Sequence, residues 1–144
     1  MKKLMSTGND VALTILRAVL GVVFLAHGSQ KMLGLFGGFG FHATMGFFTH
    51  MGVPAPLAFL IICTEFFGGL GLIVGLLTRI ASLAVAGLMI GAIFMVHLPN
   101  GFFMNWMGNQ KGEGFEFHLL ALAMAATLLL RGAGAFSLDR TLSK

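Results

Sequence analysis

Charged residues are scarce in this sequence. Asp, Glu, Lys and Arg together make up 10% of the 144 residues, whereas hydrophobic residues make up 57%. A soluble domain of this size exposes too much of its chain to water to hide that much apolar surface. The composition therefore excludes an ordinary soluble domain and indicates that lipid surrounds most of the chain.

Cysteine is almost absent, since Cys63 is the only one. A chain with one cysteine forms no internal disulfide and holds no CxxC pair, which excludes a thiol–disulfide relay within the chain. The sequence also lacks a dinucleotide-binding fingerprint and the cysteine set of an iron–sulfur cluster. In a redox reaction the electrons would therefore come from a partner protein or from the substrate itself.

The basic residues outnumber the acidic ones nine to five, but they are scattered along the chain. A nucleic-acid surface needs a basic patch, so this distribution argues against nucleic acid as a partner. In membrane proteins Lys and Arg gather on the cytoplasmic side. With the N-terminus inside, six lie on the cytoplasmic side and two outside: Lys2, Lys3, Arg79, Arg131, Arg140 and Lys144 against Lys31 and Lys111. This bias predicts that both termini are cytoplasmic.

Four apolar stretches fill most of the chain. A helix needs roughly 17 to 25 residues to cross the hydrocarbon core. The stretches at about residues 11–32, 55–77 and 80–98 reach this length, and a shorter one at about 115–131 reaches it if Arg131 extends to the interface. The expected fold is all-α: an integral membrane four-helix bundle in which residues 1–144 form a single domain.

Two long connections, at residues 33–54 and 99–114, lie on the outer side of this expected bundle. Both are rich in Gly and Phe, and the second holds Trp106, the only tryptophan. Aromatic side chains favour the membrane interface, where they have one wet and one apolar neighbour. We expect these loops to lie in the interface or to fold over the mouth of the bundle as a lid.

Small residues recur four positions apart, a spacing that brings membrane helices into close contact. The pairs are Gly71 and Gly75, Gly87 and Gly91, and Ala121 and Ala125. Because lipid gives helices little hydrophobic reason to associate, close backbone packing at such positions supplies the attraction. The pattern predicts helix contacts at all three pairs.

Two ionisable residues lie well inside the predicted spans, away from their outer ends. Glu65 is about ten residues from either end of the second span, and Arg17 lies in the first. A charge at mid-span costs roughly 2.5 to 3.5 kcal/mol on insertion scales and usually has a partner. Since a guanidinium binds a carboxylate through two hydrogen bonds, we expect Arg17 to pair with Glu65. Such a pair either locks two helices together or serves a function.

Five further polar residues fall at the outer ends of the predicted helices: His27, Lys31, His97, Glu116 and His118. A single histidine there is more often an interfacial side chain bonded to a loop. Convergence from three helices favours a site, because costly groups gather inside membranes where they have a function. We therefore expect these five residues to form one cluster beneath the two loops.

The sequence resembles the DoxX family of small four-helix membrane proteins. Five segments carry the resemblance in order along the chain: LRAVLGVVFLAHGSQKMLG (Leu16 to Gly34), TEFFGGLGLIVGLLTRIA (Thr64 to Ala81), VHLPNGFF (Val96 to Phe103), GFEFHLLAL (Gly114 to Leu122) and GAGAFSLDR (Gly132 to Arg140). The resemblance implies a multi-pass protein of the bacterial cytoplasmic (inner) membrane. It implies recurring polar and glycine positions at Arg17, His27, Gly28, Lys31, Glu65, Gly69, His97 and Glu116.

The leading functional hypothesis is a redox-linked subunit that binds a quinone or a similar apolar molecule at the outer end of the bundle. If the protein is an enzyme, this hypothesis makes it a subunit of a quinone-linked oxidoreductase. A quinone needs an apolar slot, a donor to its carbonyls and a route for protons. The candidate catalytic residues are Glu65, His97 and Glu116. The candidate ligand-binding residues are Arg17, His27, Lys31, His118 and Trp106.

Two other classes stay open at this point. The second hypothesis is a non-enzymatic membrane module, either an assembly partner for another protein or a carrier for a small molecule. Ligation of a haem or metal by His27, His97 and His118 is a third hypothesis, although nothing in their spacing demands it. The lipid membrane is the expected surrounding, and the sequence leaves a redox partner protein and self-association undecided.

Overall fold

The computed structural model describes residues 2–143, and within this range the chain is helical, with no strand. The helices are α1 (Lys2–Met5), α2 (Val11–Leu33), α3 (Gly40–His50), α4 (Ala55–Cys63), α5 (Gly69–Val74), α6 (Thr78–Ala92), α7 (Glu116–Arg131) and α8 (Leu138–Ser143). The expected all-α fold class is confirmed.

Two of the long helices contain a π-helical turn. Thr64–Gly68 (η1) joins α4 to α5, and Ile93–His97 (η2) extends α6 into a short 3₁₀ turn, Leu98–Asn100 (η3). A π turn widens the helix by one residue and often marks a functional position. One of these turns carries Glu65 and the other ends at His97.

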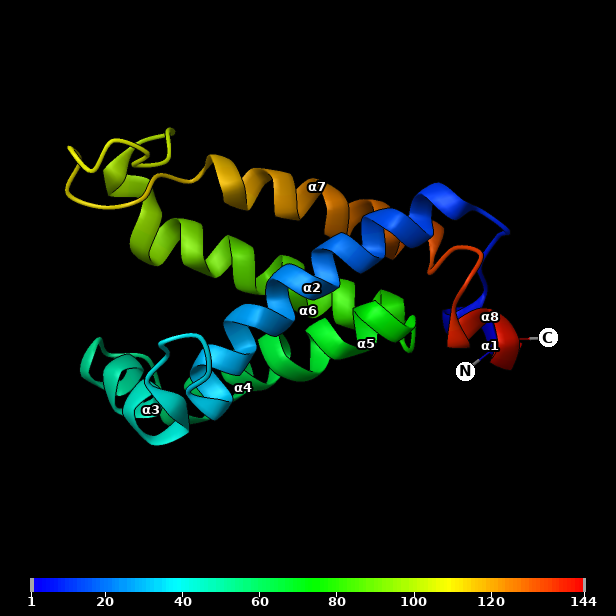
Figure 1. The fold of residues 1–144 in the computed structure, drawn as a ribbon, viewed down its shortest axis with the longest axis horizontal. Helices are drawn as coiled ribbons and strands as arrows, with labels where there is room; N and C mark the ends of the chain where they lie inside the picture. Colours follow the sequence, from blue (N-terminus) through cyan, green and yellow to red (C-terminus); the bar gives the residue numbers. More distant parts are fainter. Residues whose placement is uncertain (1, 144) are drawn as a thin grey trace.

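Three continuous helices have the length and composition needed to cross a membrane: Val11–Leu33, Ala55–Val74 and Thr78–Asn100, with 23, 20 and 23 residues. The helix α7 is shorter, with 16 residues. It packs along α6 in the opposite direction (Figure 1). The structure thus has three helices of spanning length and a shorter fourth helix beside them.

The helices form two pairs that share one core. The helix α2 packs against η1 and α5, while α6 packs against α7. Buried apolar side chains from both pairs meet between them, among them Leu20, Phe24, Leu72, Val85 and Leu128. At one end, called here the terminal end, α1 and α8 lie together; at the other, the loop end, lie α3 and the connection from α6 to α7 (Figure 1).

The terminal end is closed by the segments that precede α2 and follow α7. The backbone N–H of Ala135 donates to the carbonyl of Asp10 at 2.9 Å. The buried carboxylate of Asp139 accepts from the N–H groups of Leu77 and Thr78 at 2.7 and 2.8 Å. N–H groups at the start of a helix have no partner within that helix. Asp139 of α8 supplies one here, and thus caps α6, which is far from it in sequence.

The close helix contacts are only partly where the four-residue spacing predicts them. Ala121 and Ala125 are buried in the core as expected. A side chain added at Gly87 or Gly91 would meet nothing within 4 Å, so that predicted contact was wrong. The tightest approach is instead between α2 and the η1–α5 segment. A Cβ atom added at Gly21, Gly28 or Gly69 would meet the backbone of the neighbouring helix there.

Candidate functional site

Arg17 is buried, with 1% of its surface exposed, but it does not pair with Glu65. Its guanidinium donates to four backbone carbonyls: Leu72, Ile73 (2.7 Å), Ala133 (3.0 Å) and Phe136 (2.6 Å). Leu72 lies roughly two helical turns beyond Glu65, too far along the helix for one side chain to reach both. The expected Arg17–Glu65 pair was therefore wrong, and Arg17 instead joins the end of α5 to the C-terminal segment.

The partner of Glu65 is Lys31, near the other end of α2. Glu65 is buried within η1, whereas 25% of the Lys31 side chain is exposed. Gly28, about one turn before Lys31, lets the backbone of α2 approach the backbone of Glu65 and Phe66. The close approach of the two helices thus brings the ammonium and the carboxylate into contact.

His27 does not join the other polar residues. Its neighbours Gly28 and Ser29 occupy the buried face of α2, and His27 itself is exposed. Since successive helical residues are about 100° apart, the close packing of Gly28 turns His27 away from the interior. The expected place of His27 in the cluster was wrong. The proposed set of His27, His97 and His118 is not assembled, and residues 2–143 hold no group of three or more His, Cys, Asp or Glu suited to a metal.

His97 and His118 do come together, one from η2 and one from α7. Their ring centroids lie 4.0 Å apart with the ring planes at 40°. The Nδ1 atom of His97 is 2.8 Å from the carbonyl oxygen of Glu113, so this nitrogen is assigned as the donor. His118 is buried, and its Nδ1 atom has no hydrogen-bond partner.

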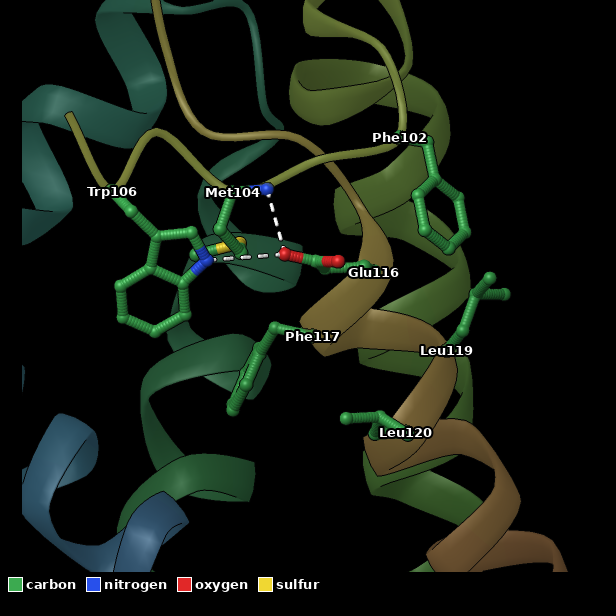
Figure 2. Close-up of a pocket in the computed structure, with 7 residues that line it drawn as sticks. All are labelled: Phe102, Met104, Trp106, Glu116, Phe117, Leu119 and Leu120. Atoms are coloured by element: carbon green, nitrogen blue, oxygen red, sulfur yellow. Dashed lines mark hydrogen bonds between the residues drawn. The ribbon is translucent and has the colours of Figure 1, made fainter. Parts of the chain in front are cut away.

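Glu116 holds the loop at residues 101–115 against the start of α7. One carboxylate oxygen, Oε1, accepts from the backbone N–H of Met104 at 2.9 Å and from Nε1 of Trp106 at 3.4 Å (Figure 2). Glu113 makes a similar contact nearby, accepting from the N–H of Asn105 at 2.6 Å. The two acidic side chains therefore position the backbone and the tryptophan of this loop.

A pocket of about 510 Å³ lies beside this carboxylate. Its lining consists of seven residues: Phe102, Met104, Trp106, Glu116, Phe117, Leu119 and Leu120 (Figure 2). Glu116 is the one charged residue in that lining. His97 and His118 do not line the pocket, although His118 lies next to Phe117 in the chain.

The five predicted residues thus do not form one cluster. They fall into the Lys31–Glu65 ion pair, the His97–His118 pair, and Glu116 in its pocket, with His27 outside all three. No hydrogen bond or ion pair described within residues 4–143 joins the first group to the others. Figure 1 shows the end of α2 and the start of α7 on opposite sides of the loop end.

Part of the pocket and both π turns could not be predicted from the sequence. Phe102 lies in a loop already noted for its phenylalanines, which was a usable signal. Leu119 and Leu120 look like any other apolar residues of a membrane helix, so nothing in the sequence marks them. The capping role of Asp139 could not be predicted either, because in the sequence it resembles an ordinary acidic surface residue.

Apolar helices of spanning length, packed around buried charged groups, define a helical membrane protein. The DoxX family model matches residues 12–98, and the chain belongs to the DoxX family. The resemblance drawn from the sequence is confirmed.

Three relatives are similar over most of their length. One is "Putative oxidoreductase CatD" of Bacillus subtilis (strain 168), 33% identical over 94% of this chain and 90% of that protein. Another is "Inner membrane protein YqjF" of Escherichia coli (strain K12), 32% identical over 100% of this chain and 98% of that protein. The third is an uncharacterized membrane protein of Mycobacterium tuberculosis, 32% identical over 90% of this chain and 80% of its own. No solved structure matches the chain.

Proposed function

We propose that this protein is a redox-linked subunit of the inner membrane that binds a quinone, or an apolar molecule of similar size, in the pocket beside Glu116. The supporting observation is the pocket itself: about 510 Å³, with six uncharged residues and one carboxylate in its lining. Small-molecule sites commonly have such a volume and few polar groups in an apolar lining. The relative named as an oxidoreductase supports a redox role.

The pocket residues suggest how the ligand is held. Phe102, Phe117 and Leu120 offer apolar contact to a ring or a short tail, and Glu116 offers a polar group at one side (Figure 2). A carboxylate within hydrogen-bond reach of a bound hydroxyl can accept its proton as a general base. Glu116 therefore carries the catalytic proposal, while roles for Glu65 and His97 in proton transfer remain predictions, because neither residue lines the pocket.

The pocket is proposed to open on the outer side of the membrane, with both termini in the cytoplasm. The support is the excess of Lys and Arg on the terminal side, and a relative is named as an inner membrane protein. A C-terminal green fluorescent protein is then expected to fluoresce in cells, whereas C-terminal alkaline phosphatase stays inactive. The same two reporters inserted after Asn109 should give the opposite result. Phosphatase activity at the C-terminus would contradict the proposed orientation.

Ligand binding can be followed through Trp106, the only tryptophan in a chain without tyrosine. It lines the pocket, so we expect a short-chain benzoquinone to quench its fluorescence in detergent with a saturable, one-to-one titration. The control is the double variant Trp106→Phe, Phe39→Trp, which moves the fluorophore away from the pocket to the other loop. Both positions are highly exposed, 85% and 86%, so the comparison isolates the distance from the pocket. That variant should show only unsaturable collisional quenching. Identical unsaturable curves for both proteins would argue against the pocket and favour the assembly-module hypothesis.

A further inference from the structure

We infer that the pocket selects a ligand that carries a phenolic hydroxyl, such as a hydroquinone, over the corresponding quinone. This inference rests on the proposed function and specifies which redox form of the ligand the pocket binds. It follows from the hydrogen bonds of the polar side chains in the lining: the two N–H groups that face Glu116 are already used, and one carboxylate oxygen is free.

The two N–H groups that face Glu116 from the loop are both occupied. Met104 donates its backbone N–H and Trp106 its Nε1–H, and both point to the same oxygen, Oε1 (Figure 2). No described residue donates to the second oxygen, Oε2. Figure 2 shows this oxygen on the opposite side of the carboxylate, toward Phe102. Among the side chains of the lining, the free polar atom is therefore an acceptor.

The apolar side chains of the lining add neither a donor nor an acceptor. The side chains of Phe102, Phe117, Leu119 and Leu120 contain no nitrogen or oxygen. An ionised carboxylate only accepts hydrogen bonds. A hydroxyl of the ligand can donate to Oε2, whereas a quinone carbonyl placed there would set two acceptors against each other. A polar site that matches a hydroxyl strongly rejects the analogue that lacks the donor.

The test compares three probes of similar size: an alkylated 1,4-hydroquinone, its dimethyl ether and the matching benzoquinone. Binding to the whole protein in detergent is measured anaerobically, by Trp106 fluorescence and by calorimetry. A hydrogen bond to a charged group predicts that the hydroquinone binds about 10- to 100-fold more tightly than either of the others. This comparison needs no variant, so it is decisive even if a substituted protein does not fold.

The substitution Glu116→Gln sharpens the comparison. The amide keeps an acceptor for Met104 and Trp106, and places an NH₂ donor where Oε2 was. The preference is expected to reverse, with the quinone gaining affinity and the hydroquinone losing it. The matched control is Glu113→Gln, because Glu113 also contacts the loop but does not line the pocket. This control should leave all three affinities unchanged.

The outcomes separate this inference from the proposed function. If the three probes bind with equal affinity and Glu116→Gln changes nothing, the selectivity for a hydroxyl is wrong, while binding of an apolar ring in the pocket stands. A tighter affinity for the quinone in the unaltered protein also overturns the inference. If no probe gives saturable binding, the proposed function itself fails.

Discussion

Arg17→Met is expected to remove most of the folded protein. The guanidinium donates to four carbonyls on two separate segments, and methionine of similar length supplies no donor. Two of these hydrogen bonds, to Leu72 and Ala133, are buried. Each buried acceptor left without a partner costs about 1–3 kcal/mol, so the combined loss should be at least about 2 kcal/mol. The midpoint of thermal unfolding in detergent and the yield of monodisperse protein measure this effect.

Two further arginine variants test whether the loss of stability comes from the hydrogen bonds of Arg17. Arg131→Met is the matched control, because Arg131 is exposed and has no described hydrogen bond; it should melt close to the unaltered protein. Arg17→Lys should be intermediate, since an ammonium keeps the charge but cannot direct a planar set of donors to several carbonyls. Equal melting of Arg17→Met and Arg131→Met would show that the contacts of Arg17 contribute nothing.

The same measurement tests the separation of Arg17 from Glu65. Residues without shared contacts have additive effects on stability, whereas a direct pair does not. Losses for Arg17→Met and Glu65→Gln should therefore add in the double variant. A double variant as stable as Arg17→Met alone would restore the direct pair that the sequence suggested.

The helices could be predicted because lipid imposes a simple rule on composition. A segment that crosses the hydrocarbon must be long, apolar and helical, so hydropathy located the spans to within a few residues. The expected first span at 11–32 compares with Val11–Leu33, which Asp10 caps and which Gly34 ends with a positive φ of 73°. The π turns are different, because one extra residue per turn leaves no compositional trace.

Charged residues inside the spans could be recognised as buried, but their partners could not be chosen. Helical counting gives the face on which a side chain lies, not the relative depth of two neighbouring helices. That depth is set by the contact of Gly21, Gly28 and Gly69, which the sequence alone does not align. For this reason Glu65 was expected beside Arg17 and lies beside Lys31.

The site at the loop end could be predicted only in part, for a similar reason. Glu116 and Trp106 were both proposed as site residues, and the structure places them in contact. Their meeting depends on how a Gly-rich loop folds back, a property that sequence periodicity does not describe. His97 and His118 were expected at one depth, and the antiparallel packing of α6 and α7 brings them together. His27 was expected at the same depth, but it lies on the exposed face of α2.

Gly28→Ala is expected to destabilise the protein even though alanine is the better helix former. A Cβ atom at this position would meet the backbone of Glu65 and Phe66, and backbone cannot step aside as the end of a side chain can. Overpacking typically costs about 1–3 kcal/mol, and separation of two helix backbones places the cost at the upper end. The roughly 1 kcal/mol gained in helix propensity does not offset this. The Lys31–Glu65 pair, about one turn away, would be pulled apart as well.

Gly87→Ala is the matched control, because it makes the same chemical change in another membrane helix where nothing lies within 4 Å of the new atom. Here the gain in helix propensity acts without a steric cost, so stability should rise by up to about 1 kcal/mol. The two variants are thus expected to shift the unfolding midpoint in opposite directions, measured in the same detergent. If Gly28→Ala also raises the midpoint, α2 and η1 do not pack backbone to backbone, and the contact that sets the depth of Lys31 against Glu65 is absent. Should both variants lower it equally, the effect belongs to glycine in membrane helices generally and not to this contact.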